Sequence, residues 1–205
     1  MGRQSTAGRA PAHGPRHPAP RPVLAQRVRI IGGHWRRRMI SFPSAQDLRP
    51  TPDRVRETVF NWLGQDMQGL RCLDLFAGSG ALGFEAASRG AAEVLMLERD
   101  AVLLRGLVEV KTRLHADAVQ VIGSEALAWL SRCTPGRFDL VLLDPPFDSD
   151  LFDAALAAAA PAVAAGGFLY LEAPRPFAAV PAGFTAHRHL RAGAVHAHLF
   201  RRVDG

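Results

Sequence analysis

The residues with the clearest chemical potential are Asp144, Pro145, Pro146 and Phe147, which follow the apolar run 140–143. Each proline fixes its own φ, removes a backbone donor and pushes the residue before it into an extended conformation. The Asp144 carboxylate and the Pro145 carbonyl are therefore held stiffly where a buried strand reaches the surface. The pattern predicts two fixed hydrogen-bond acceptors beside an aromatic ring.

Two fixed acceptors suit methyl transfer to a planar amine. The lone pair of such an amine is delocalised into a ring or a carbonyl, so the nitrogen must become tetrahedral before it can attack a methyl group. Acceptors aimed at its two N–H bonds favour that state through orientation and electrostatics. Phe147 could stack on a flat substrate, worth about 1–3 kcal/mol per base in comparable sites, and a paired base would first have to be flipped out. The alternative is that these residues only end a strand and start a loop.

A glycine-rich loop lies upstream, in residues 73–85, "LDLFAGSGALGFE". Gly78, Gly80 and Gly83 satisfy G-x-G-x-x-G between an apolar strand and a helix, and Glu98 follows Gly78 by twenty residues. The glycines let a ligand approach the backbone, and the acid can accept hydrogen bonds from ribose hydroxyls. A purely structural tight turn is the alternative.

Two polar features favour S-adenosylmethionine over a dinucleotide in this loop. Asp74 precedes Gly78 by four residues and could meet the ammonium of a methionine moiety, which a pyrophosphate ligand lacks. Ser124 and Glu125 follow the third predicted core strand, where a polar group could bind the adenine edge. An NAD-dependent oxidoreductase stays open as a rival, but it leaves Asp144 to Phe147 without a role.

The elements around these residues alternate between strand and helix, which predicts an α/β fold with a doubly wound, mostly parallel sheet. The predicted core strands are 71–76, 93–98, 118–123, 138–144 and 167–172, and the predicted helices lie near 81–89, 100–115, 124–131 and 150–160. Residues 184–191 and 194–202 predict an antiparallel hairpin around an Ala192-Gly193 turn. Before the core, residues 27–31 and 34–42 predict two strands around Gly32-Gly33. A helix with Thr51 as its N-cap and Gly64 at its end follows them.

Positive charge is concentrated at the start of the chain. The first 46 residues hold nine arginines and no acid, although the whole chain of 205 residues carries a net charge of only +6. Residues 1–26 have four arginines, five prolines and no apolar periodicity, so we expect a disordered basic tail. We expect a single domain over 27–205, with an N-terminal hairpin and helix in 27–64 and the catalytic core in 70–205. The asymmetry suggests a polyanionic partner, most simply nucleic acid, and we expect phosphate contacts from one set of arginines: Arg29, Arg36, Arg37, Arg38, Arg49 and Arg54. Solvated faces are the alternative.

The remaining polar clusters predict little chemistry. Two cysteines far apart, Cys72 and Cys133, fit a reducing cytoplasm rather than a disulfide framework. Four histidines form two His-x-His pairs at 187, 189, 196 and 198, which the predicted hairpin would place on one face. No cysteine or carboxylate joins them, so we expect no metal site.

Taken together, Asp-Pro-Pro-Phe, the loop "DLFAGSGALGFEAASRGA" and the segments "RIIGGHWRRR" and "RPTPDRVRETVFNWL" resemble the RsmD family of bacterial 16S rRNA (guanine-N2)-methyltransferases. The similarity covers about residues 27–202. It implies the class I methyltransferase fold, Rossmann-like, with a seven-stranded sheet whose last strand is antiparallel, and S-adenosylmethionine as the cofactor. It also implies a 16S rRNA or an assembling small subunit as partner, a monomer and a cytoplasmic location.

The resemblance also assigns roles residue by residue. Asp74 and Gly78 to Gly80 would hold the methionine part of the cofactor, Glu98 the ribose, and Ser124 and Glu125 the adenine. Asp144 to Phe147 would hold the target amine and base. The implied cofactor contacts are Asp74, Phe76, Ala77, Gly78, Ser79, Gly80, Glu98, Arg99, Ser124 and Glu125. The motif fixes the class of reaction, while adenine N6, cytosine N4 or a protein glutamine stay open as targets.

Overall fold

The computed structural model of the chain describes residues 25–43, 51–147 and 150–203. Most of the tail predicted over 1–26, and the predicted RNA contact Arg49, lie outside these residues. Ala25 and Gln26 belong to the first strand, so the folded part begins two residues earlier than expected.

The core is a seven-stranded sheet in the order β5-β4-β3-β6-β7-β9-β8. Its strands are β3 (Arg71–Asp74), β4 (Glu93–Glu98), β5 (Val119–Gly123), β6 (Phe138–Leu143), β7 (Val163–Ala173), β8 (Phe184–Ala192) and β9 (Val195–Arg202). Neighbouring strands from β5 to β7 pair in parallel, while β9 pairs antiparallel with both β7 and β8. The predicted sheet and its C-terminal hairpin are therefore confirmed.

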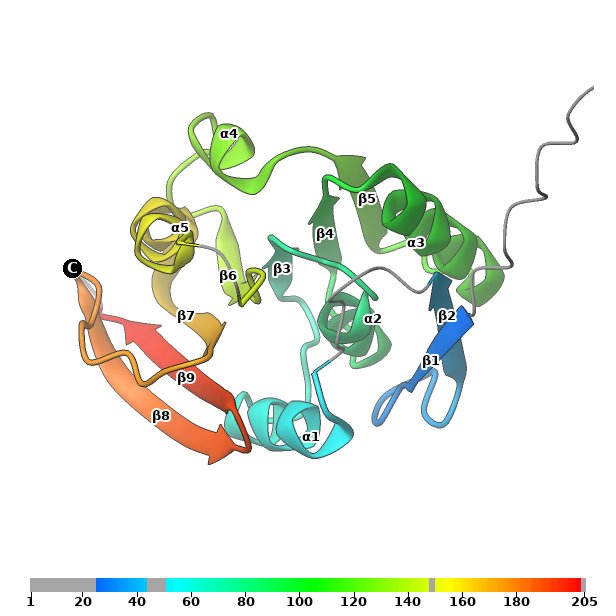
Figure 1. Ribbon diagram of the computed structural model, residues 1–205, viewed down its shortest axis with the longest axis horizontal. Coiled ribbons are helices and arrows are strands. Elements are labelled where there is room, and N and C mark those ends of the chain that lie inside the picture. The colour runs from blue at the N-terminus through cyan, green and yellow to red at the C-terminus, as the bar shows by residue number, and fades with distance from the viewer. Residues whose placement is uncertain (1–24, 44–50, 148–149, 204–205) are drawn as a thin grey trace, which may run out of the picture.

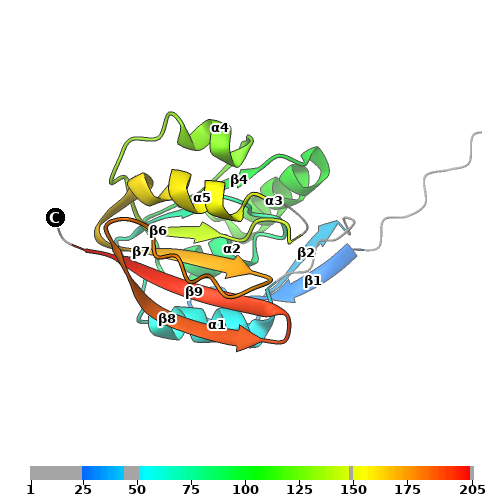
Figure 2. The same cartoon turned by 60° about the vertical axis from the view of Figure 1, so that its left-hand side comes forward.

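Helices cover both faces of this sheet (Figures 1 and 2). They are α1 (Asp53–Trp62), α2 (Ala81–Ser88), α3 (Ala101–Leu114), α4 (Ala126–Leu130), α5 (Phe152–Ala159) and the short 3-10 helix η1 (Ala160–Ala162). Residues of α1, α2 and α3 share one buried apolar cluster with Cys72 of β3, whereas α4 and α5 share the other with Leu73. Side chains alternate across each strand, so Asp74 lies on the side of α1, α2 and α3.

The N-terminal strands, β1 (Ala25–Arg29) and β2 (Met39–Pro43), form a separate two-stranded sheet. The second strand was expected to begin at residue 34, but 34–37 form a turn instead. This turn is held on α2, because Trp35 N–H donates to Ser88 Oγ at 2.9 Å and Gly33 leaves no space for a side chain against the Ser88 carbonyl. Contact with α2, which no local pattern reveals, thus overrides the extended preference of this segment.

Buried charge anchors this N-terminal segment to the core. The Glu85 carboxylate accepts hydrogen bonds from Ile31 N–H at 2.8 Å and Gly32 N–H at 2.7 Å. It also pairs with Arg56 at 3.3 Å and Arg89 at 2.8 Å. The Arg56 side chain is fully buried and donates to the Arg29 carbonyl at 2.7 Å. The network fixes β1 and the start of α1 beside the sheet.

Helix α1 begins without the cap that its sequence predicts. Pro52 occupies the N-cap position and makes no side-chain cap. The Thr51 hydroxyl, expected to cap the helix, donates instead to Glu172 Oε1 at 2.7 Å. The cap prediction was therefore wrong because a buried carboxylate takes this hydroxyl.

The C-terminal hairpin turns one residue later than predicted. Ala192 pairs with Val195, so Gly193 and Ala194 form the turn, with Gly193 at φ +63°. His189 consequently pairs with His198, whereas a turn at Ala192-Gly193 would have paired it with His196. No helix in the described part of the chain is long and apolar enough to span a membrane.

Candidate active site

The predicted site residues converge where the strand order reverses, between β3 and β6. In open α/β sheets, ligands bind at such a switch point, beyond the carboxyl ends of the strands. Asp74 ends β3 and pairs with Leu142 of β6, while Leu143 pairs with Leu171 of β7. Asp144 and Glu172 each follow by one residue, so acids end three neighbouring strands.

The glycine loop joins the end of β3 to the start of α2, as its sequence predicts. Gly78 and Gly80 adopt φ +50° and +77°, which is the left-handed region where glycine is favoured. A Cβ on Gly80 would meet Phe84 and Leu107 at 2.6–2.7 Å. The Gly78 N–H donates to Glu98 Oε2 at 2.9 Å, which joins the loop to the end of β4.

Glu98 is fixed from both sides, as a ribose ligand would need to be. Besides Gly78, the Asp100 N–H donates to Glu98 Oε1 at 2.8 Å. Each carboxylate oxygen keeps a further lone pair, so Glu98 can still accept from two hydroxyls. Phe76 is half-buried, Ala77 and Ser79 are buried in the loop, and Arg99 is exposed beyond the strand.

Asp74 has one carboxylate oxygen whose hydrogen-bonding capacity is left for a ligand. Its Oδ2 accepts from the Gly83 N–H at 3.1 Å, while its Oδ1 is buried and lacks a partner among the described residues. Burial raises the pKa of Asp74 to about 7, and the charges of Glu98 and Glu172 add to the rise. A buried acceptor in a field of acids calls for a cationic donor.

The predicted adenine residues have local roles in the free protein. Glu125 is the N-cap of α4 and accepts from the Leu127 and Ala128 N–H groups at 3.2 and 2.7 Å. The Ser124 hydroxyl donates to the Glu125 carbonyl at 3.2 Å. Their assignment to adenine stays a prediction. Because Glu125 caps α4, Ser124 has more hydrogen-bonding capacity left for a ligand.

Asp144 is half-buried at the mouth of the site, Pro145 is buried, and Pro146 and Phe147 are exposed. The Phe147 ring is 39% exposed and lies 6.4 Å from the Phe152 ring, centroid to centroid. One edge of the ring is thus supported while a surface is open for stacking. Desolvation raises the pKa of Asp144 well above its ordinary value, helped by the charges of Glu172 and Asp74, whereas the Thr51 hydroxyl lowers it.

Glu172 and its partners were not among the predicted site residues. Tyr170 Oη and Thr51 Oγ1 both donate to Glu172 Oε1, at 2.8 and 2.7 Å. The signal available in the sequence was a single acid at the end of the apolar run "GFLYL", where a buried charge is unusual.

Four of the predicted RNA contacts are exposed: Arg36, Arg37 and Arg38 in the connection between β1 and β2, and Arg54 on α1. The Arg29 side chain is 57% exposed and pairs with Asp53 at 3.0 Å. Together with Arg27 and Met39, Arg29 lines a pocket of about 380 Å³ that reaches Thr51. Arg27 and Arg29 therefore lie at a pocket whose wall includes Thr51, the hydrogen-bond partner of Glu172.

Three histidines of the hairpin lie close together. Nitrogens of His189, His196 and His198 lie within 4.8 Å of one another. His189 Nε2 and His196 Nδ1 are 3.2 Å apart, which is hydrogen-bond distance, so these two rings already engage each other. His198 Nε2 also accepts from the Phe177 N–H at 3.2 Å, which favours a packing role.

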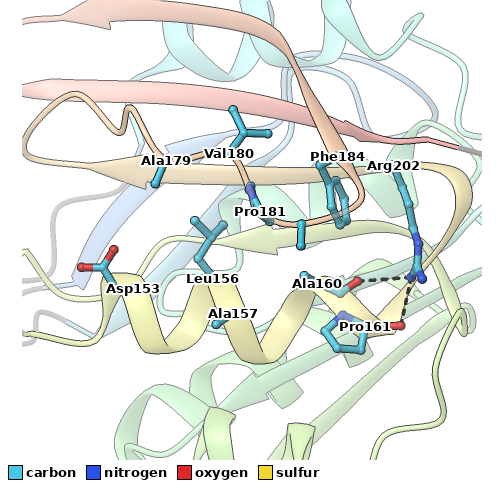
Figure 3. Close-up of a pocket in the computed structure, with 11 residues that line it drawn as sticks. Asp153, Leu156, Ala157, Ala160, Pro161, Ala179, Val180, Pro181, Phe184 and Arg202 are labelled. Atoms are coloured by element: carbon cyan, nitrogen blue, oxygen red, sulfur yellow. Dashed lines mark hydrogen bonds between the residues drawn. The ribbon is translucent and has the colours of Figure 1, made fainter.

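A second pocket, of about 450 Å³, runs along α5 (Figure 3). Arg202 donates there to the carbonyls of Ala160 and Pro161 at 3.3 and 3.2 Å. Its lining is mostly apolar and contains none of the predicted site residues. The chemistry of the molecule therefore concentrates at the strand ends.

A family model and a named relative both match most of this chain. The model of a family described as conserved hypothetical protein 95 matches residues 28–201. Ribosomal RNA small subunit methyltransferase D of Escherichia coli strain K12 is 39% identical over 180 residues, which span 85% of this chain and 90% of that protein.

Two solved structures are similar over most of this chain. The yhhF protein of Escherichia coli has a TM-score of 0.77 and 37% identity, over 88% of this chain and 100% of its own. The 16S rRNA N2 G1207 methyltransferase of Thermus thermophilus, solved with AdoMet and guanosine, has a TM-score of 0.64 and 25% identity, over 88% of this chain and 50% of its own.

Proposed function

We propose that this chain, which belongs to the RsmD family, is an S-adenosylmethionine-dependent methyltransferase of 16S ribosomal RNA. The RsmD family is the one described as conserved hypothetical protein 95. Its target is the exocyclic N2 amine of a guanine. The observation that carries this function is the position of Asp144 to Phe147 at the switch point of the sheet, one strand from the unpartnered Oδ1 of Asp74.

The residues at the strand ends fit S-adenosylmethionine. The unpartnered Asp74 Oδ1 suits the α-ammonium of a methionine moiety, and Glu98 retains acceptor capacity for ribose hydroxyls. A pyrophosphate would instead place negative charge among Asp74, Glu98 and Glu172. The charges of Glu98 and Glu172 already raise the pKa of Asp74. This donor set therefore supports the methyl-donor cofactor over a nicotinamide dinucleotide.

The bound cofactor supplies an electrophilic methyl group on a sulfonium. The protein's part in the reaction is to hold the amine and to favour its tetrahedral form. The Asp144 carboxylate and the Pro145 carbonyl accept from the two N–H bonds, and Phe147 stacks on the base. The prolines keep both acceptors fixed, so little reorganisation is needed as positive charge develops on nitrogen.

The RNA is held, in this proposal, by the exposed arginines of β1, of the connection between β1 and β2, and of α1: Arg29, Arg36, Arg37, Arg38 and Arg54, with Arg49 outside the described residues. Such contacts position a phosphate backbone, whereas the pocket at Asp144 selects the base. Arg56, fully buried against Glu85, serves the fold instead. The tail over 1–24 would add affinity without choosing the target.

The proposal extends to organisation and location. Residues 25–203 act as one methyltransferase domain, in which β1, β2 and α1 face the RNA. The protein works as a monomer on 16S rRNA or on an assembling small subunit, and therefore in the cytoplasm, where that substrate occurs.

The test is transfer of a tritiated methyl group to small subunits from cells that lack this enzyme, followed by nucleoside analysis of the RNA. We expect the label in N2-methylguanosine at one position. Label in adenosine, cytidine or ribosomal protein would overturn the choice of target, and binding of NAD without transfer would overturn the reaction class.

A further inference from the structure

Glu172 stands at the site without a role in the function proposed above. It ends an apolar stretch of β7 and is only 2% exposed. Its Oε1 accepts hydrogen bonds from Thr51 at 2.7 Å and from Tyr170 at 2.8 Å. A buried acid held by two hydroxyls, next to the strand that delivers Asp144, indicates a role beyond packing.

The Thr51 hydroxyl lies between two acids. It donates to Glu172 at 2.7 Å and lowers the pKa of Asp144, which lies beside Glu172 because Leu143 pairs with Leu171. A hydroxyl has a single proton to donate, so it can serve one carboxylate at a time and must accept from the other. The Thr51 hydroxyl can serve both carboxyl groups when Asp144 and Glu172 hold one proton between them. Thr51 takes this position instead of capping α1, as its sequence context predicts.

Few positive charges oppose the acids here. Glu172 faces Asp144 on β6, Asp74 on β3 and Tyr170 on its own strand, while Arg56 of α1 is the cation that acts on it. Burial raises the pKa of Glu172 to about 7, against the opposing effects of Thr51, Tyr170 and Arg56. The free site therefore holds a proton near neutral pH, and two interacting acids titrate as a pair.

We propose that Glu172 is a positioning residue: it shares one proton with Asp144 through the Thr51 hydroxyl, and this pair receives the proton that the target amine loses. The inference rests on the proposed function for its chemistry. The sharing of the proton is a property of the free protein and can be measured without any substrate.

The step balances as follows in atoms and charge. The lone pair of the amine nitrogen forms the N–C bond, and the electrons of the breaking C–S bond stay on sulfur. With the shared proton on Glu172, Asp144 is ionised, and the nitrogen sheds one proton to Asp144 while keeping the N–H bonding pair. The positive charge moves from sulfur to nitrogen as the N–C bond forms and leaves the nitrogen with the proton. The pair then holds two protons and releases one to solvent.

The first test is a carbon-13 NMR titration of the side-chain carboxyls in the free protein. In Glu172→Gln, the Asp144 midpoint should fall by about one pH unit or more, because a coupled acid has been removed. Thr51→Val should instead raise the Asp144 midpoint, because the hydroxyl that lowers the pKa of Asp144 is lost, and the matched variant Thr51→Ser should recover the wild-type titration. An Asp144 midpoint that is unchanged in Glu172→Gln would rule out the shared proton.

The second test is the single-turnover rate of methyl transfer against pH. Glu172→Gln should be at least about tenfold slower at neutral pH, with its rate midpoint displaced in the same direction as its Asp144 titration. Cofactor affinity measured on the same sample checks that the variant is folded. A titration that moves while the rate profile stays in place would refute proton reception by the pair. Failure of the wild-type protein to methylate RNA would refute the proposed function instead, and the titration would still decide the sharing.

Discussion

Replacing Asp74 by asparagine should stabilise the free protein while weakening its hold on the cofactor. The Asp74 side chain is 1% exposed, and burial raises its pKa from 3.8 to about 7. Between these values the folded state binds more protons than the unfolded state, so this group makes wild-type stability fall as pH rises through that window. Asparagine carries no charge and lacks this loss.

The size of the effect follows from the same two pKa values. The free energy of unfolding of Asp74→Asn minus that of the wild type should increase by on the order of 3 kcal/mol between pH 5 and pH 8. Cofactor affinity should fall by about 10- to 150-fold, since a charged hydrogen bond of roughly 1.5–3 kcal/mol to the ammonium is lost. Urea unfolding at several pH values and calorimetry with S-adenosylmethionine measure the two quantities.

Asp139 offers a matched control with the opposite sign. Its hydrogen bond to Arg71 holds the pKa of Asp139 below its ordinary value, so Asp139 contributes stability that is present above that value and lost as pH falls. Asp139→Asn should therefore destabilise the protein at pH 8 and leave cofactor affinity unchanged. The reasoning would be refuted if Asp74→Asn followed the wild-type pH dependence or bound the cofactor as tightly.

Three further predictions concern other parts of the molecule. Glu98→Ala should weaken the cofactor by about 1–3 kcal/mol in calorimetry, because ribose hydroxyls lose a charged acceptor; an unchanged dissociation constant would place the ribose acid elsewhere. Arg56→Ala should lower the free energy of unfolding by about 3 kcal/mol or more, since it removes a buried partner of Glu85; exposed Arg54→Ala should change it by about 0.5 kcal/mol at most, and equal losses would contradict the buried network. Deleting residues 1–24 should leave cofactor affinity and the methylated nucleotide unchanged but reduce the salt dependence of subunit binding, because fewer counterions are released; an unchanged salt slope would mean that the tail does not touch RNA.

Local patterns were sufficient to predict most of the fold. Short apolar strands alternating with helices predicted the doubly wound, mostly parallel sheet, and the glycines at 78 and 80 predicted a loop between a core strand and a helix. These features depend on periodicity and on backbone freedom, both of which can be read within a few residues. The order of the strands then brought Asp74 and Asp144 together as the motifs required.

The errors arise where tertiary contacts override a local rule. Thr51 has the sequence of an N-cap but bonds Glu172, which lies 121 positions away. The segment 34–37 turns because Trp35 bonds Ser88 on α2. The burial of Arg56 by the Glu85 network likewise depends on a residue outside its own helix. No pattern within one segment specifies these long-range partners, and Glu172 was missed for the same reason.

The most direct measurement of the central claim is single-turnover methyl transfer by wild type and Asp144→Ala on small subunits lacking the modification, with cofactor affinity measured on the same samples. The account predicts N2-methylguanosine from the wild type, no detectable transfer by Asp144→Ala, and similar cofactor affinity for both. Transfer by Asp144→Ala within about tenfold of wild type, which is about 1.4 kcal/mol of barrier, would contradict the role of Asp144 in holding the amine.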